Sequence, residues 1–431
     1  MPVELKPRGG IRPSAWELTA MNHDNSQHNF RAFAWHASWL GFTVTFTEIN
    51  TILPGLIVEV GGSQIHVGIL TAIMVGAPML TQLLFAGFLT PKPLKKPFLL
   101  LGIYLRVVAL AGVAWTLSRL TSINPAFMIF LIYAWMLVFT TSGSFAGVSY
   151  TDILGKSIVG DQRKRFFVLR QFLSSIGVLI SALIARELLK RFAYPMNYEI
   201  LFIAAAGCLF LASLGFVVLR EKPVSSRYES SSVLEIFKFI PGYLREDANL
   251  RNFIIVNNLA GFATTLTPFY VVLAKDTYSL TTDDIGNFLL IGISGMVLSN
   301  FLWSRIVKNH SFKGVMMVWV FIGASLPVLA LALSTWAPYM LFQTIFFLSG
   351  MAISAQKISL GGVLIEISEN DNRALYSGIN GAFNLTIAIF PLISGFVIVW
   401  LGYAPVFILG SVAMISALYF VRRLNCEISN P

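Results

Sequence analysis

The longest polar stretch of this 431-residue chain is "REKPVSSRYESSSVLEIFKFIPGYLREDANLR", residues 220–251, and it separates two long apolar regions. Over the whole chain 56% of residues are hydrophobic and 12% are charged, whereas roughly 25% are charged in an ordinary soluble domain. One compact core cannot hide so much apolar surface from water. The composition therefore predicts a polytopic helical membrane protein, with this polar stretch as its central linker.

Apolar runs of about 20 residues recur on both sides of the linker, and about 20 helical residues cross a hydrocarbon layer of ~30 Å. Six runs precede the linker and six follow it, which predicts an all-α protein with twelve membrane helices in two six-helix bundles. The expected spans are 31–58, 65–89, 97–118, 125–155, 166–189, 199–219, 252–274, 284–305, 314–334, 338–363, 374–400 and 403–421.

These spans also define the expected domains. The first 28 residues are polar, contain Pro2, Pro7 and Pro13, and lack the apolar stretch of a signal peptide, so we expect a short unstructured tail. The predicted boundaries are a tail at 1–28, a bundle at 29–220, a linker at 221–250, a bundle at 251–423 and a tail at 424–431.

The formal net charge of +10 could indicate nucleic-acid binding, but the placement of the basic residues argues for a topological role. The connections between spans alternate in charge. Most lysines and arginines lie in one alternate set, to which the linker belongs. The other set holds only Arg119, Arg186, Lys190, Arg191 and Lys275. By the positive-inside rule both termini and the linker are cytoplasmic, in a cytoplasmic (inner) membrane, and no nucleic-acid partner is expected.

The two halves share a short pattern. A shift of 208 residues places "GDQRKRFFVLRQ" (160–171) over "SENDNRALYSGI" (368–379), so that Asp161 meets Glu369 and Arg165 meets Arg373. Both segments follow the fourth span of their half, as a duplication requires. Parallel six-helix repeats are typical of transporters.

The segments "RKRFFVLR" (163–170) and "NRALYSG" (372–378) resemble the cytoplasmic connections after the fourth and tenth helices of bacterial major facilitator superfamily proteins. The resemblance extends over nearly the whole chain in topology. It implies the fold of that family, with pseudo-symmetric halves around a central cavity, and transport of a solute by alternating access.

Two departures from the family pattern concern the second loop and the fifth helix. The loop "GFLTPKPLKKP" (87–97) keeps Gly87 and its lysines but has Pro91 at the usual acidic position. The fifth helix lacks the Gly-Pro element that is common in drug:proton antiporters of the family. The first departure means that a carboxylate that normally helps to latch the cytoplasmic side is missing or replaced. The second makes multidrug export a weaker hypothesis without excluding it.

Within the first span, "TVTFTEINTILP" (43–54) contains one carboxylate, Glu48. A charged side chain at the membrane centre costs about 2.5–3.5 kcal/mol, and such residues are usually kept for a partner or a water-filled path. Two interpretations stay open. Glu48 is either a structural carboxylate bonded to another helix, or it lines the cavity and takes up a proton or a cationic part of the substrate.

Polar stripes on other helices suggest further cavity residues, although such stripes also serve helix packing. The substrate or proton-coupling candidates are Thr45, Glu48, Asn257, Asn258, Thr264, Thr265, Gln343, Ser354, Lys357, Asn380 and Asn384.

Charges near the cytoplasmic ends suggest a gate, for which the candidates are Asp152, Arg163, Arg165, Glu366 and Arg373. Asp152 and Lys357 lie on helices related by the duplication, and they either pair when the cytoplasmic side closes or act separately. Arg163 or Arg165, together with Arg373, are expected to contact carboxylates or helix C-terminal carbonyls. Arg106 is a structural candidate and the first cation to test as a partner of Glu48.

A membrane enzyme is the rival class. "GISG" (292–295) matches a short serine motif of intramembrane proteases, but the only histidine within a span is His36, near a membrane end. Gly292 and Gly295 are better interpreted as helix-packing residues. No zinc-protease or phosphate-binding motif is present, and Cys208 and Cys426 do not suggest a metal site.

The sequence therefore predicts a secondary active transporter of a small organic solute, with no catalytic residue, cofactor or metal. Coupling to protons or another ion is expected, and the expected partners are the solute, the coupling ion and the lipid bilayer. The protein is expected to be a monomer. An uncoupled facilitator, an exporter of an amphiphilic compound and a transporter-like receptor stay open as competing hypotheses.

The orientation is testable at Ser230 in the linker. In intact cells, a maleimide that cannot cross membranes should leave Ser230→Cys unlabelled, because the charge bias places this residue in the cytoplasm. Cys208 and Cys426 are replaced by serine in the parent protein. Labelling from outside, before the cells are opened, would contradict the topology.

Overall fold

The computed structural model describes residues 15–89, 91–119, 124–158, 161–221, 242, 244–278, 280–368 and 373–426. For residues 15–24, 83, 161, 164 and 373–375 it describes the backbone only. The helices of the first half are α1 (Ala15–Phe46), α2 (Ile52–Glu59), α3 (Gln64–Leu89), α4 (Lys96–Ser118), α5 (Pro125–Ser157), α6 (Asp161–Arg191) and α7 (Met196–Val217). Those of the second half are α9 (Ala248–Thr264), α10 (Thr267–Tyr278), α11 (Thr282–Trp336), α12 (Tyr339–Phe342), α13 (Thr344–Ile367), α14 (Arg373–Phe383), α15 (Thr386–Leu401) and α16 (Tyr403–Arg422).

The described helices agree with the predicted membrane protein. Ten segments are long and apolar enough to cross a membrane. One of them, α11, joins two helices at Ser311, whose φ of 62° lies outside the helical region. With α1 and α2 as the first span, these segments are consistent with the twelve predicted helices.

Local sequence signals set where several helices begin. At the start of α5, the Asn124 side chain accepts a hydrogen bond of 2.8 Å from the backbone N–H of Ala126, and proline follows at the first helical position. Asp247 accepts from the N–H groups of Asn249 and Leu250 at the start of α9. Both side chains satisfy donors that the helix itself leaves unpaired.

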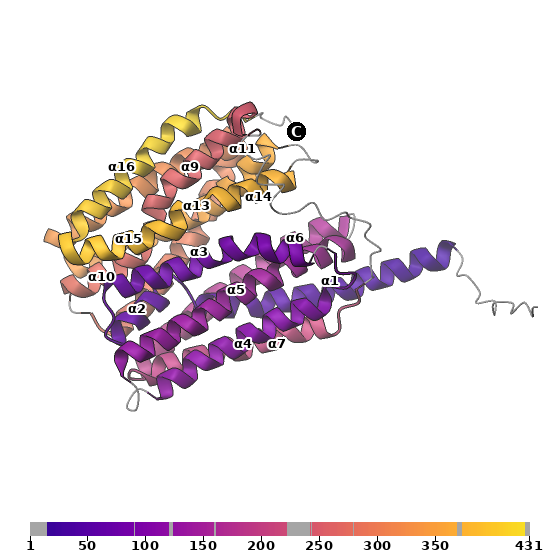
Figure 1. The fold of residues 1–431 in the computed structure, drawn as a ribbon, viewed down its shortest axis with the longest axis horizontal. Helices are drawn as coiled ribbons and strands as arrows, with labels where there is room; N and C mark the ends of the chain where they lie inside the picture. Colours follow the sequence, from indigo (N-terminus) through magenta and orange to yellow (C-terminus); the bar gives the residue numbers. More distant parts are fainter. Residues whose placement is uncertain are drawn as a thin grey trace, which may run out of the picture.

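The expectation of an unstructured tail up to residue 28 is wrong for the part that the structure describes. Helix α1 begins at Ala15 and extends past the other helices of its bundle (Figure 1). No proline or glycine interrupts the chain between Pro13 and Gly41, so nothing in the sequence stops the first span from continuing outward.

The second difference from the predicted spans is that four of them are broken. The first divides into α1 and α2, the seventh into α9 and α10, the tenth into α12 and α13, and the eleventh into α14 and α15. A non-helical turn at membrane depth leaves backbone N–H and C=O groups that water cannot satisfy. Each break therefore requires hydrogen-bond partners from the protein.

Glycines bring α11 and α13 into close contact. A Cβ atom at Gly350 would lie 1.9 Å from the carbonyl oxygen of Gly292, and one at Gly295 would lie 2.1 Å from that of Phe347. The backbones of the two helices therefore touch at these points. This confirms the packing interpretation of the "GISG" segment.

The duplication is also visible in paired contacts that tie the first helix of each half to its last. The Asn29 side chain bonds reciprocally with the backbone of Arg220, with donor–acceptor distances of 2.8 and 2.9 Å. Asn249 makes the same pair of bonds to the backbone of Asn425, at 3.3 and 2.9 Å. Each asparagine begins the pattern Asn-x-Arg-x-Phe, at 29–33 and 249–253.

Two lysines repeat a second contact of the same kind. The Lys96 Nζ donates to the carbonyls of Val217, the last residue of α7, and of Leu219. The Lys313 Nζ donates to the carbonyls of Arg422 and Leu424 at the end of α16. A cation suits the negative end of a helix. We call the end of the molecule with these contacts the linker end.

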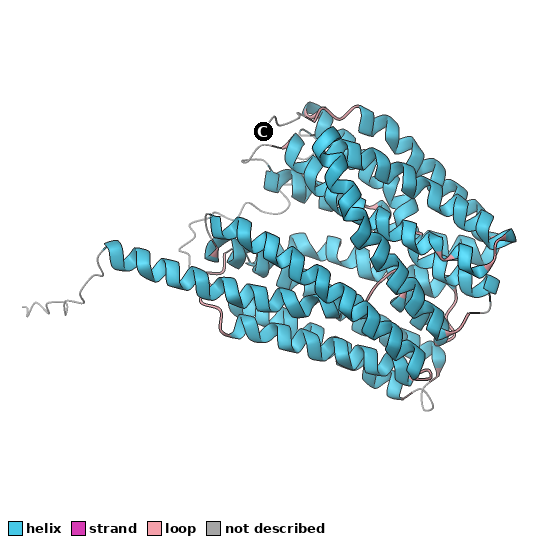
Figure 2. Cartoon of the chain, turned by 180° about the vertical axis from the view of Figure 1, so that it is seen from behind, coloured by secondary structure: helices cyan, strands magenta, loops and turns pink. Residues whose placement is uncertain are grey.

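The two halves meet at the opposite end, which we call the far end. Ribbons of the two halves lie close together around α2 and α10 and diverge toward α6 and α14, as seen from both sides (Figures 1 and 2). Helix α3 packs against α15 across the boundary: a Cβ atom at Gly68 would lie 2.3 Å from the Pro391 carbonyl oxygen.

The glycine contact between α11 and α13 gives a stability prediction. Gly350→Ala should lower the thermal unfolding midpoint of the purified protein, because overpacking a tight contact costs about 1–3 kcal/mol. The control is Gly361→Ala on the same helix, where an added Cβ atom meets nothing within 4 Å. Equal midpoints for the two variants would contradict the described packing.

Candidate functional site

Glu48 lies in the break between α1 and α2, where its carboxylate binds Asn50 and Thr51, two and three residues further along the chain. Its Oε2 accepts hydrogen bonds from the N–H groups of Asn50 (2.8 Å) and Thr51 (2.7 Å) and from the Thr51 hydroxyl (2.8 Å). Its Oε1 accepts from the Asn50 side chain at 2.7 Å. The half-buried carboxylate thus satisfies backbone donors ahead of α2.

The equivalent break in the second half is made differently. The segment "GFATTLTP" (261–268) repeats "GFTVTFTE" (41–48), with Pro268 at the position of Glu48. Thr45 and Thr265 both donate to the carbonyl oxygen four residues earlier, at 3.0 and 2.8 Å. Pro268 lies in the first turn of α10 and removes one N–H that would lack a partner there, whereas in the first half Glu48 accepts from the N–H groups of Asn50 and Thr51.

A further break lies at Asn384 and Leu385, between α14 and α15. Asn258 from α9 forms hydrogen bonds with the residues on both sides of it. The Asn258 amide donates to the carbonyl of Phe383 at 2.8 Å and accepts from the hydroxyl of Thr386 at 3.0 Å. Nearby, the side-chain amide of Asn257 donates a hydrogen bond to that of Asn380. The Asn384 Oδ1 atom is buried and has no hydrogen-bond partner.

The remaining predicted cavity residues are placed by local contacts. Thr264 donates to the carbonyl of Ala260 in its own helix. Ser354 donates to Asn300 across the α11–α13 contact at 2.7 Å. Gln343 separates α12 from α13, and Lys357 is exposed.

At the far end, an ion pair joins the ends of the two broken helices. The Lys275 ammonium of α10 donates to the Glu59 carboxylate of α2, and both side chains are largely buried. Tyr194, between α6 and α7, lies beside this pair. Its burial and the charge of Glu59 raise the pKa of Tyr194 to about 12.

A second polar group at the far end involves three residues. Gln64 of α3 donates to Asp276 at 2.9 Å and to Tyr403 at 3.2 Å, and the Tyr403 hydroxyl donates to Asp276 at 2.7 Å. Asp276 and Tyr403 belong to the second half and Gln64 to the first, so the bonds of Gln64 cross the boundary between the halves.

A third contact at this end joins α6 to α11. The Arg186 guanidinium donates to the Asn287 side chain at 2.6 Å. A Cβ atom at Gly286 would lie 2.8 Å from the Arg186 Cα, so the helices are close. Among the described residues, the side-chain hydrogen bonds and the ion pair between the halves lie at the far end.

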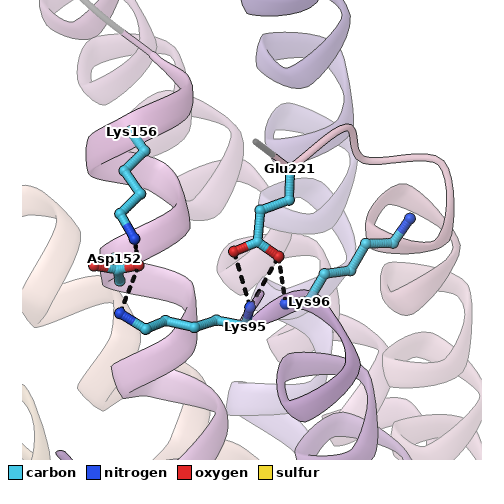
Figure 3. A network of polar contacts seen from close by, with 5 residues as sticks. All are labelled: Lys95, Lys96, Asp152, Lys156 and Glu221. Carbon is cyan, nitrogen blue, oxygen red and sulfur yellow. Dashed lines mark hydrogen bonds and ion pairs between the residues drawn. The ribbon is translucent and has the colours of Figure 1, made fainter. Parts of the chain in front are cut away.

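At the linker end, charged residues instead join helices within the first half (Figure 3). Asp152 of α5 pairs with Lys95 at 2.8 Å and with Lys156 one turn along its own helix. Glu221 accepts from the backbone N–H groups of Lys95 and Lys96 and so caps α4. The suggested pair of Asp152 with Lys357 is not formed in this structure. Asp152 binds Lys95 and Lys156 instead, and both belong to its own half.

The other gate candidates have separate environments. Arg163 donates to the carbonyls of Ile158 and Gly155 at 3.0 and 2.7 Å, which is the expected contact with a helix C-terminus. Arg165 is exposed, and the side chain of Arg373 lies outside the described residues.

Glu366 lies at the end of α13, where its Oε1 accepts from the N–H of Phe312 at 3.4 Å. Its Oε2 is buried without a hydrogen-bond partner. Burial and a hydrogen bond to Glu366 raise the pKa of the Cys426 thiol to about 12.

Arg106 does not contact Glu48, so this suggested pairing is wrong. Its guanidinium lies on the ring of Phe139, 4.3 Å from the centroid, while the bonds of Glu48 go to Asn50 and Thr51. The Nε atom of Arg106 is buried and has no hydrogen-bond partner.

Sequence reasoning missed the residues that hold the far end together: Glu59, Gln64, Arg186, Lys275, Asp276, Asn287 and Tyr403. Most of them flank predicted spans, where a charged or polar side chain is ordinary and signals no partner. The Asn-x-Arg-x-Phe and Gly-Phe-x-x-Thr-x-Thr repeats, which recur after 220 residues, would have revealed the paired helices.

Part of the second half of the chain matches a known sequence family. Residues 253–425 match the sequence model of the Major Facilitator Superfamily. No curated protein matches the chain in sequence.

Solved transporters share the fold over nearly the whole chain. The nucleoside transporter NupG aligns with a TM-score of 0.62 and 14% identity, over 93% of this chain and 99% of that one. A POT family transporter in complex with 5-aminolevulinic acid gives 0.66 and 11%, over 92% and 96%. The human organic anion transporter MFSD10 (TETRAN) gives 0.62 and 14%, over 92% and 99%. The predicted resemblance to this superfamily and its fold is confirmed.

Proposed function

We propose that this major facilitator superfamily protein is a secondary active transporter that moves a small organic solute across the cytoplasmic membrane by alternating access. The observation that carries the proposal is the asymmetry of the contacts between its halves. Polar contacts such as Glu59–Lys275 and Arg186–Asn287 join the halves at the far end. At the linker end, contacts such as Lys95–Asp152 hold helices within one half.

This arrangement favours motion of each half as a unit. The Asn29 and Lys96 contacts fasten the first and third spans to the end of α7, and Asn249 and Lys313 do the same in the second half. Besides the close packing of Gly68 on Pro391, the far end is held by polar contacts. Water can replace these polar contacts when that end opens. With the linker in the cytoplasm, the described conformation would be open to the cytoplasm.

Glu48 is our candidate for proton coupling. An ionised carboxylate can accept all four hydrogen bonds from Asn50 and Thr51. A protonated carboxyl becomes a donor at one oxygen and loses part of this capacity. Protonation would therefore loosen the turn between α1 and α2, and so link proton uptake to the helix that ends at the Glu59–Lys275 pair.

An uncoupled facilitator is the second candidate, because the bonds to Glu48 equally suit a purely structural cap. Export of an amphiphilic compound and solute binding by a transporter-like receptor are two further hypotheses. Reconstitution into liposomes separates them. A coupled carrier accumulates its solute when a pH gradient is applied, a facilitator only equilibrates it, and a receptor binds it without flux.

The test uses Glu48→Gln and Glu48→Ala, with a solute chosen by a thermal-shift screen of metabolites, amino acids, siderophores and drugs. The glutamine Oε1 can accept from the N–H groups of Asn50 and Thr51, and the Asn50 amide can turn to accept from its Nε2. Glu48→Gln should therefore fold normally, lose pH-driven accumulation and keep solute exchange.

Glu48→Ala removes the cap and should lower stability by about 0.5–2 kcal/mol. Measurement of uptake with and without a pH gradient, and of thermal midpoints, decides between the roles. Undiminished pH-driven accumulation by Glu48→Gln would rule out the coupling role. Absence of flux by the unmodified protein for every stabilising solute would contradict the proposed transport function.

A further inference from the structure

A group of basic and aromatic side chains lies inside the first half and takes no part in the contacts at either end. Arg106 comes from α4, Tyr150 from α5, Arg170 from α6 and His36 from α1. The Arg170 guanidinium lies 5.7 Å from the centroid of the Tyr150 ring. The His36 ring lies 6.0 Å from that of Tyr150, and both arginines are within electrostatic range of His36. Four helices therefore converge on one positively charged region.

The two arginines have no hydrogen-bond acceptor among the residues that the structure describes. Among the described residues, neither guanidinium forms a hydrogen bond or an ion pair, and the buried Nε of Arg106 has no partner at all. A guanidinium has five N–H donors. Unpaired charges are unfavourable within a membrane span, where such residues normally pair with one another or with carbonyls. An acceptor from outside the chain would satisfy these donors.

Two carboxylates of the first half, Glu48 and Asp152, are already bound by other residues. Glu48 is bound by Asn50 and Thr51 within its own turn. Asp152, two residues after Tyr150, pairs with Lys95 and Lys156. The region around Arg106 and Arg170 therefore carries an excess of positive charge that the described residues do not balance.

The backbone is shaped to admit the Arg106 guanidinium. A Cβ atom at Gly143 of α5 would lie 3.3 Å from its Nε, so a larger residue there would press on it. The Phe139 ring, one turn away on the same helix, lies against the guanidinium, with the Arg106 Cζ 4.3 Å from the ring centroid. This support fixes the plane of the side chain, and a fixed guanidinium suits bidentate binding of a carboxylate, phosphate or sulfonate.

We infer that Arg106 and Arg170 form a binding site for the anionic group of the transported solute, with Tyr150 and Phe139 contacting its apolar part. The identity of the anion as transported solute rests on the proposed function. Binding of an anion at this site does not. The inference specifies the substrate class as an organic anion.

The test measures the thermal stabilisation of the purified protein by benzoate, phenyl phosphate and benzenesulfonate, against the neutral benzamide and the cationic benzylamine. At least one anion should stabilise the protein, and the neutral and cationic probes should not. In Arg106→Met and Arg170→Met the anion should bind at least about tenfold more weakly, because a hydrogen bond to a charged group contributes about 1.5–3 kcal/mol.

Two matched controls separate the site from general charge and packing effects. Arg119→Gln removes one positive charge from the exposed end of the same helix as Arg106 and should bind the anion normally. Gly143→Ala should weaken binding, whereas Gly147→Ala should not, because an added Cβ atom at Gly147 meets nothing within 4 Å.

Three results would overturn the inference: stabilisation by none of the anions, equal stabilisation by benzamide, or unchanged anion binding in both methionine variants. The assay measures binding without transport. Arginine-dependent anion binding in a protein that shows no flux would therefore leave the site intact and refute only the proposed function.

Discussion

A polar backbone group inside a membrane has to find its hydrogen-bond partner within the protein, and this constraint explains the most unusual residue of the chain. The first membrane span is interrupted before α2, and the Glu48 carboxylate accepts hydrogen bonds from the N–H groups of Asn50 and Thr51, which the interruption leaves without helical partners. The eleventh span is interrupted at Asn384, and Asn258 from another helix bonds to both sides of that break. Charged and amide side chains at membrane depth thus make irregular backbone possible where the two halves approach each other.

The same constraint applies at the linker end, where helices stop and their last carbonyls need donors. Lys96 and Lys313 each supply an ammonium to the end of the last helix of their half, and Asn29 and Asn249 bond to the following residue. The two sets are related by the internal duplication. At this end the helices of each half are therefore bonded to one another. Among the described residues, the side-chain hydrogen bonds between the halves lie at the far end.

Much of the fold was predictable, because span length and the polar linker depend on composition averaged over many residues. The twelve spans, their division into halves and the glycine packing at "GISG" follow from such patterns. The breaks were less predictable, because only Pro268 carries a local signal against helix. Glu48 carries no such local signal. Its carboxylate can accept the N–H bonds only when Asn50 and Thr51 form a turn.

The candidate site was only partly predictable for a related reason. Asn257, Asn258 and Asn380 lie together as their stripes suggested. The partners of charged residues were not predictable, since a charge in the sequence does not indicate which helix it faces. Arg106 was suggested as a partner of Glu48 to be tested because of its depth alone, and its guanidinium lies instead on the ring of Phe139. Asp152 binds Lys95, which the sequence placed only as a topological charge.

The central claim is that the halves move against each other so that one end opens as the other closes. Distances between spin labels test it most directly, in lipid nanodiscs and with Cys208 and Cys426 replaced by serine. One label pair, Val168→Cys with Asn309→Cys, lies on α6 and α11 toward the linker end. The other, Lys190→Cys with Asp283→Cys, lies on the same two helices at the far end. Alternating access predicts two populations for each pair, with the long linker-end distance accompanying the short far-end distance and the fractions changing with pH. A single distance at both ends under all conditions, or both ends opening together, would contradict it.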